Sequence, residues 1–157
     1  MINEVRALIW REHILTKRVE FIAFKSQQIN PSRNRPKGHE LVELPGGTNS
    51  DHPGENAWAT VAREVQEEIS LSFVPSSAER LVEEEPEEGV IRHAFLIPYG
   101  MCSGILRVGG PIRDGSKLLF APKFMTIEEL CTSPIFSRTQ RGILLLGLWK
   151  IGLLKGL

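Results

Sequence analysis

Three glutamates, Glu64, Glu67 and Glu68, lie within a little over one helical turn in the segment REVQEEIS, residues 63–70. Like charges at this spacing repel each other by a few tenths of a kcal/mol per exposed pair, so the cluster needs a reason. On a helix, side chains at i, i+3 and i+4 lie on one face, and these carboxylates can converge on one point. Such an oxygen cluster suits Mg²⁺, which keeps coordination positions for water and substrate phosphates. A solvated helix face is the alternative, and it does not explain the clustering.

The apolar residues around the glutamates predict a helix over 55–69. They recur at i, i+3 and i+4 and form one stripe: Trp58, Val61, Ala62, Val65 and Ile69. The glutamates border this stripe, so we expect the core to shelter them partly from water. A short predicted strand, 41–44, runs into Pro45, Gly46 and Gly47, where the backbone can turn and approach a ligand closely.

Together these residues resemble the signature of the Nudix (MutT-like) hydrolases. That pattern is Gly, five residues, Glu, seven residues, then Arg-Glu-aliphatic-any-Glu-Glu-any-Gly-aliphatic. Residues 46–71 follow it with two departures: seven residues separate Gly47 from Glu55, and Ser70 replaces the last glycine. The longer loop costs little closure entropy. The serine at a left-handed helix C-cap is expected to cost about 1 kcal/mol.

The resemblance implies an α/β (α+β) fold, a Nudix-like α/β/α sandwich with a mixed β-sheet, in a single domain over 1–157. It implies an enzyme that acts on acid anhydrides, a pyrophosphohydrolase that uses Mg²⁺, with Mn²⁺ as a substitute. The substrate would be a nucleoside diphosphate linked to another moiety: a nucleoside triphosphate, ADP-ribose or a sugar nucleotide. A non-catalytic nucleotide sensor on the same fold is the alternative class, and it predicts lost signature glutamates, whereas all are present.

The resemblance also implies roles for individual residues. Glu64, Glu67 and Glu68 would be metal ligands, with the carbonyl of Gly46 as a fourth, and one of the acids would orient or deprotonate the attacking water. Arg63 would orient a glutamate, by pairing with Glu67 or Glu55. Glu55 and Gly47 would have structural roles, at the start of the helix and in the turn before it.

Outside the signature, the residues leave more alternatives open. The loop 27–40 carries Arg33, Arg35 and Lys37, which form either a solvated loop or a basic lip over an anionic substrate. A further acid for the metal site is sought in the glutamate-rich segment 83–88. His93 alternates with apolar neighbours and is interpreted as structural rather than catalytic.

The composition narrows the class of partner. Nineteen basic and nineteen acidic residues give a net charge of zero, which argues against nucleic acid as a partner. Cys102 and Cys131 lack metal-ligand spacing and are interpreted as free thiols in a reducing compartment. The first residues lack the uninterrupted apolar core of a signal peptide, so a cytoplasmic protein with a small-molecule nucleotide substrate is expected.

The remaining segments predict a layered domain of strands and a few helices. Strands are expected at 5–10, 18–24, 79–85, 89–100, 104–110 and 117–122, and helices at 126–134 and 137–149. The leucine-rich segment 142–157 is interrupted by glycines and lysines, which argues against a membrane span. We expect it to pack on the sheet of its own domain; a homodimer interface and contact with a membrane surface are the alternatives.

Overall fold

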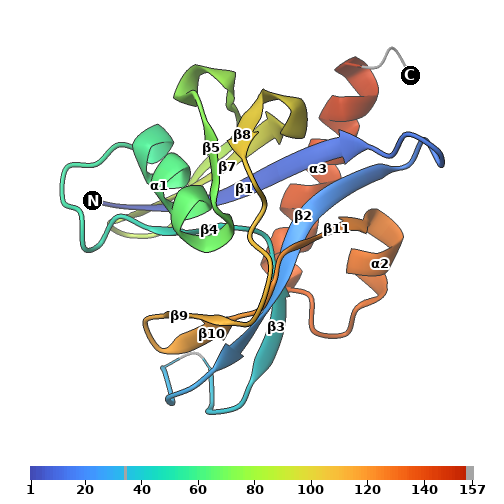
Figure 1. The fold of residues 1–157 in the computed structure, drawn as a ribbon. Helices are drawn as coiled ribbons and strands as arrows, with labels where there is room; N and C mark the ends of the chain where they lie inside the picture. The colour runs from blue at the N-terminus through green and yellow to red at the C-terminus, as the bar shows by residue number, and fades with distance from the viewer. Residues whose placement is uncertain (34, 155–157) are drawn as a thin grey trace.

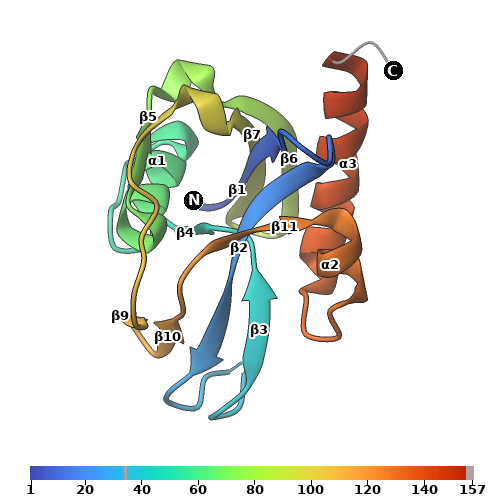
Figure 2. The same cartoon turned by 45° about the vertical axis from the view of Figure 1, so that its right-hand side comes forward.

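The protein is built on one mixed β-sheet with helices on both of its faces (Figures 1 and 2). The computed structural model describes residues 1–33 and 35–154. The larger strands and the helices are β1 (Ile2–Glu12), β2 (Val19–Gln28), β3 (Glu40–Glu43), β6 (Glu79–Glu87), β7 (Val90–Pro98), α1 (Ala57–Ile69), α2 (Ile127–Thr132) and α3 (Arg138–Leu154). Within the described residues, four short strands belong to the same sheet: β4 (Gly46–Thr48), β9 (Ile112–Asp114), β10 (Lys117–Leu119) and β11 (Lys123–Thr126). Two more, β5 (Leu71–Phe73) and β8 (Cys102–Gly104), pair with each other in a separate small sheet.

Strand β1 lies in the middle of the sheet. It runs parallel to β7 and antiparallel to β2 and β4, and the main path of the sheet is β6-β7-β1-β2-β10-β9. Alternate side chains of a strand point to opposite faces. Accordingly Val5, Ala7 and Ile9 enter one hydrophobic core and Leu8 enters the other, all without solvent exposure. The mixed sheet of an α+β protein, expected from the resemblance, is confirmed.

The helices cover the two faces of the sheet separately. The apolar stripe of α1, with Val61, Val65 and Ile69 fully buried, packs in the core on one face. The buried residues Leu130 of α2 and Leu144 of α3 belong to the core on the other face. Figure 2 shows α1 and α3 on opposite sides of the strands. The face of α1 that turns away from the core is therefore free to border a site.

The C-terminal helix α3 packs on the sheet with one side only. Ile143, Leu144 and Ile151 are buried there, as expected for this segment. On its outer side Leu145, Leu146 and Trp149 are exposed. No helix in the described residues is long and apolar enough to cross a membrane. The homodimer stays a prediction, and residues 155–157 of the leucine-rich segment lie outside the described residues.

Two expectations from the sequence are wrong in detail. The segment 104–110 is mostly irregular rather than a strand: Gly104 and Gly109 have positive φ angles, of 94° and 98°. Arg107 in this segment donates instead to the carbonyl oxygens of Glu68 and Phe120, at 2.9 Å each. Helix α1 also starts later than predicted. The short strands β4, β5, β8, β9 and β11 were not predicted, because three or four residues carry too little periodicity to be seen in a sequence.

Candidate active site

Helix α1 is fixed at both ends by local interactions. Asn56 caps its first turn, with Oδ1 accepting from the amide of Ala59 at 2.9 Å. Because the cap is Asn56, Glu55 lies in the loop just before the helix rather than within it. At the other end Ser70 has φ 65° and ψ 25°, the left-handed conformation that was expected to be costly for a serine.

The three signature glutamates differ strongly in burial. Glu68 is only 1% exposed, and its Oε1 accepts from the amide of Gly46 at 2.7 Å. Glu64 is 8% exposed, whereas the side chain of Glu67 is 53% exposed. The acids therefore form a gradient from the core to the solvent along one side of α1, and two of the three are sheltered more than the sequence suggested.

Arg63 holds this region together. Its guanidinium contacts Glu55 at 3.1 Å, Glu64 at 3.0 Å and Glu67 at 3.2 Å. It also donates to the carbonyl oxygen of Thr48 at 2.9 Å. The sequence predicted a pair with Glu67 or Glu55, and the arginine in fact joins both of them and Glu64. It thereby fixes α1 to Glu55, in the loop before the helix, and to Thr48 of β4.

The glycines of β4 are required by close packing. A Cβ atom on Gly47 would lie 2.4 Å from the Glu64 side chain, and one on Gly46 would lie 2.0 Å from the carbonyl oxygen of Val5. The preceding residue pairs with β1, since the amide of Ala7 donates to the Pro45 carbonyl at 2.7 Å. Hydrogen-bonded and non-hydrogen-bonded positions alternate in an antiparallel ladder, so Gly46 does not bond to β1. Its amide and its carbonyl both point away from β1, and the amide donates to Glu68 on that side.

A cavity of about 560 Å³ lies beside these residues. It is lined by Arg6, Gly46, Gly47, Thr48, Ser50, Asp51, His52, Arg63, Glu64, Glu67, Asp114, Gly115, Ser116 and Lys117. The site thus joins β1, the α1 region and the β9–β10 hairpin. Asp114, Arg6 and Lys117 were not identified from the sequence. The Asp114-Gly115 pair is a typical hairpin turn signal, but it does not reveal that the hairpin faces α1.

The electrostatics of the site disfavour the charged form of its two buried glutamates. Burial raises the pKa of Glu64 to about 7 and that of Glu68 to about 8. The Oε2 atom of Glu68 is buried and has no hydrogen-bond partner in the described part of the chain. Sheltered carboxylate oxygens without enough donors are the ligands that a hard divalent cation prefers, so the residues fit Mg²⁺ or Mn²⁺.

The acids are nevertheless not arranged around a common point. In the described residues, no three His, Cys, Asp or Glu side chains are placed to hold an ion together. The convergence expected from the i, i+3, i+4 spacing is therefore absent in this arrangement. The reason is that Arg63 binds Glu64 and Glu67, while Glu68 is turned to the amide of Gly46.

The other charged candidates lie elsewhere. Arg35 contacts Glu43 at 3.7 Å and borders a separate cavity of about 460 Å³, and Lys37 borders a smaller one. Neither these two nor Arg33 lines the cavity beside α1. Within the described residues the glutamates of 83–88 do not line it either; Glu84, for example, pairs with Arg92 at 3.2 Å.

His93 has the structural environment that was expected for it. It is 3% exposed, and its Nε2 lies 3.1 Å from Oδ1 of Asn3. Burial and the nearby charge of Arg80 lower its pKa, so the ring is neutral at physiological pH.

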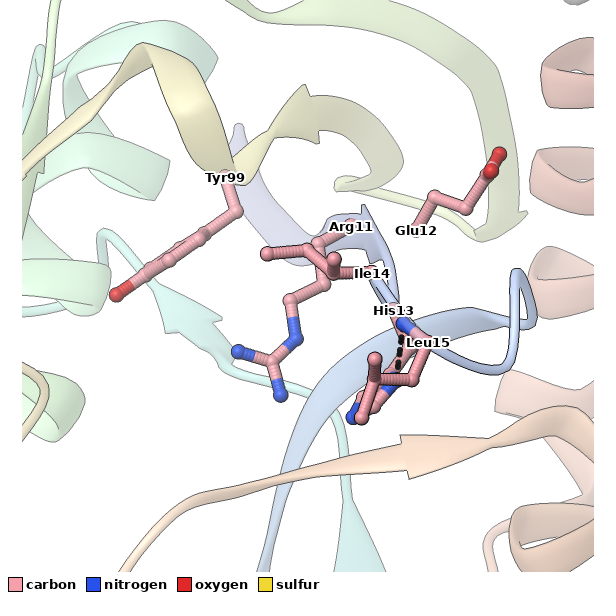
Figure 3. A pocket seen from close by; sticks show the side chains of 6 residues that line it. All are labelled: Arg11, Glu12, His13, Ile14, Leu15 and Tyr99. Carbon is pink, nitrogen blue, oxygen red and sulfur yellow. Dashed lines mark hydrogen bonds between the residues drawn. The ribbon is translucent and has the colours of Figure 1, made fainter.

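Another cavity, of about 520 Å³, lies at the turn between β1 and β2. Figure 3 shows Arg11 and Tyr99 extending to one side of it, while Glu12 points the other way. Ile14 and Leu15 add an apolar rim. This cavity contains none of the signature residues and has no cluster of carboxylates among the residues that line it, so its chemistry does not suit a phosphoanhydride.

Comparison with known proteins supports the architecture. No protein-family model matches the sequence, and no curated protein matches it. Solved structures do match. A MutT protein from Methanosarcina mazei Go1 has a TM-score of 0.58 at 22% identity, over 90% of this chain and 88% of that chain. A MutT Nudix hydrolase from Burkholderia pseudomallei has a TM-score of 0.55 at 19% identity, over 88% and 92%. The Nudix domain of Shewanella oneidensis NrtR, in complex with ADP ribose, has a TM-score of 0.51 at 20% identity, over 85% and 78%.

These similarities, together with the mixed sheet and its two helix layers, define the class: this chain has the MutT/Nudix fold. At such low identity the likeness concerns the fold, and the chemistry has to be argued from the residues of the site.

Proposed function

We propose that the protein is a single-domain pyrophosphohydrolase that cleaves a phosphoanhydride in a nucleoside diphosphate derivative with the help of Mg²⁺ or Mn²⁺. The observation that carries this proposal is the pair of sheltered carboxylates, Glu64 and Glu68, beside a glycine turn and a polar cavity. Phosphoryl transfer depends mainly on positioning and charge neutralisation, and both can be supplied at such a site.

The residues that would hold the metal are Glu64, Glu67 and Glu68, with the carbonyl of Gly46 as a backbone ligand. When bound, the ion would neutralise phosphate charge and lower the pKa of a coordinated water. Glu64 and Glu67 would have to exchange contacts with Arg63 for contacts with the ion. Arg63 would keep its bond to Glu55 and so hold α1 in place during that exchange.

The chain also offers cations for the phosphates of the substrate. Arg6 and Lys117 both line the cavity, and they take the role that the sequence suggested for Arg33, Arg35 and Lys37. Asp114 lines the cavity from the β9–β10 hairpin, and its charge contributes to the raised pKa of Glu64. We assign Asp114 as the additional acid of the site, in place of the glutamates of 83–88.

A carboxylate must accept the proton of the attacking water. Glu64, Glu67 and Glu68 are the candidates for this role, because they lie together on α1 at the proposed metal site. The substrate class that fits is a nucleoside triphosphate, ADP-ribose or a sugar nucleotide. The cytoplasmic location expected from the sequence stays part of this proposal.

A non-catalytic nucleotide sensor is the second candidate. The observation that favours it is the pairing of Glu64 and Glu67 with Arg63, which leaves no assembled metal site among the residues that the structure describes. One experiment separates the two. Purified protein is incubated with Mg²⁺ or Mn²⁺ and a panel of nucleoside triphosphates, ADP-ribose, sugar nucleotides and dinucleoside polyphosphates, and phosphate, pyrophosphate and nucleoside monophosphate are measured.

Metal-dependent release that EDTA abolishes supports the enzyme. Nucleotide binding by calorimetry without any product, at micromolar enzyme over several hours, supports the sensor instead.

A further inference from the structure

The loop between β4 and α1 is the part of the site that departs from the spacing of the Nudix signature. It folds into two consecutive turns, in which the amide of His52 donates to the Asn49 carbonyl at 2.9 Å and the amide of Glu55 donates to the His52 carbonyl at 3.1 Å. The two turns shorten a seven-residue connection and bring Asp51 and His52 to the cavity. Something must hold Glu55 in place at the end of this longer loop.

Two asparagines do so, Asn3 of β1 and Asn49 of the loop itself, and neither occupies a fixed position of the signature. The backbone amide of Asn3 donates to Oδ1 of Asn49 at 2.8 Å, and the backbone amide of Asn49 donates to the Asn3 carbonyl at 3.2 Å. Both side-chain amides then donate to the same atom, the carbonyl oxygen of Glu55, at 3.2 Å from Asn3 and 2.9 Å from Asn49. Asn49 is 4% exposed, so these bonds are sheltered from competing water.

His93 orients the first of these asparagines from the neighbouring strand β7. Because the Asn3 amide nitrogen donates to Glu55, its Oδ1 must be the acceptor, and His93 Nε2 must carry the proton. The other ring nitrogen, Nδ1, is buried and has no hydrogen-bond partner within residues 1–33 and 35–154. Among the described residues the ring therefore makes one hydrogen bond, which is directed at Asn3.

We propose that Asn3 and Asn49, oriented by His93, are positioning residues that fix Glu55 and, through it, Arg63. The Glu55 carboxylate accepts hydrogen bonds from two nitrogens of Arg63, Nε and Nη2, both at 3.1 Å. Arg63 in turn contacts Glu64 and Glu67. A series of polar contacts thus connects strands β1 and β7 with the proposed metal ligands. These contacts hold Glu55 in place at the end of a loop that is longer than in the signature. Its effect on metal binding rests on the proposed function; its effect on Arg63 does not.

The test uses two variants of Asn49 and one control. Asn49→Ala removes the whole contact, and Asn49→Asp keeps an acceptor for the Asn3 amide but removes the donor to Glu55. Asn56→Ala is the matched control, since it removes the N-cap of α1 and lowers stability without removing a bond to Glu55. All are made in the full chain, and circular dichroism establishes that each is folded.

The first measurement is solvent exchange of the Arg63 Nε proton by ¹⁵N NMR without metal. We expect exchange at least about tenfold faster in both Asn49 variants than in the wild type and Asn56→Ala, because the Glu55 acceptor is displaced. The second is Mn²⁺ affinity by electron paramagnetic resonance, expected to fall about tenfold or more, as for loss of outer-shell partners of a metal site.

The outcomes are distinguishable. Equal Arg63 exchange in Asn49→Ala and Asn56→Ala would overturn the positioning role, even if the wild type is an active enzyme. If the wild type neither binds Mn²⁺ nor hydrolyses any nucleotide, the proposed function fails, and the exchange measurement still decides whether the asparagines position Arg63. Slower exchange or tighter Mn²⁺ binding in Asn49→Asp would also contradict the proposal.

Discussion

The carboxylate of Glu64 lies directly against the backbone of Gly47, so closely that a Cβ atom at Gly47 would be 2.4 to 2.6 Å from three of its atoms. Real Cβ atoms essentially never approach other atoms so closely, and one of the two residues would have to move. The glycine turn and the helix therefore fit each other at the proposed metal ligand.

Gly47→Ala is expected to displace Glu64 and lower turnover by about tenfold or more, since a small misplacement of a catalytic group costs much of its effect. The added methyl group should also weaken Mn²⁺ binding. Gly100→Ala is the matched control, because nothing lies within 4 Å of a Cβ there. Steady-state kinetics and Mn²⁺ titration measure the effect, and equal parameters for the two variants would contradict the assigned position of Glu64.

Glu67→Gln is expected to lower turnover by about a hundredfold or more, in line with loss of a ligand or general base. Because the Glu67 side chain is 53% exposed and its ion pair with Arg63 is a surface one, the melting temperature should change little. Thermal unfolding and product release are measured side by side. Unchanged activity in this variant would eliminate the site assignment.

Asp114→Asn tests the acid that was found only in the structure. The substitution keeps the size of the side chain and removes its charge from the cavity, so Mn²⁺ affinity or activity should fall by about tenfold. Glu87→Gln, in the segment where the sequence suggested the extra acid, should change neither. The reverse result, a loss with Glu87→Gln only, would return the assignment to the β6–β7 hairpin.

The stability of the metal-free protein should fall as the pH rises from about 5 to about 8. The folded-state pKa of Glu68, about 8, lies above its ordinary value of 4.5. In this interval the folded state holds a proton that the unfolded state has lost, so the free energy of unfolding decreases with pH. The slope is about 1.4 kcal/mol per pH unit for one such group.

Glu68→Gln mimics the protonated carboxyl and should remove the contribution of Glu68 to this slope, while Glu64, whose pKa burial raises to about 7, still contributes at lower pH. Urea unfolding with EDTA at several pH values measures it, with Glu87→Gln as the reference. If the slope between pH 5 and 8 is the same in Glu68→Gln and the wild type, Glu68 is not the group that titrates.

Ser70→Gly should stabilise the protein by about 1 kcal/mol, because glycine adopts the left-handed C-cap conformation without the cost of a Cβ atom. For a chain of this size that corresponds to a rise of about 2–4 °C in melting temperature. Ser70→Ala keeps the Cβ atom and should give no such gain. Activity should stay unchanged in both, and a gain in Ser70→Ala equal to that in Ser70→Gly would rule out backbone strain as the cause.

Much of the fold was predictable from local patterns. The apolar stripe of α1, the strand before the glycine turn and the capping box that starts α2 at Thr126 all depend on residues within a few positions of each other. The segment 104–110 was misjudged because its conformation depends on a distant contact, the side chain of Arg107 on the carbonyl oxygens of α1 and of the segment after β10.

The sequence by itself determined the identity and spacing of the acids on α1, the glycine turn before them and the costly Ser70, because helical periodicity and backbone conformation are local properties. Only the tertiary structure decided which glutamate is buried and which is exposed. It also decided that Arg63 joins three acids, and that Asp114, Arg6 and Lys117 share their cavity. Asn3 and His93 contribute from strands that the sheet places beside the loop. These relations depend on how strands distant in the sequence pair in space, and neither composition nor periodicity contains that information.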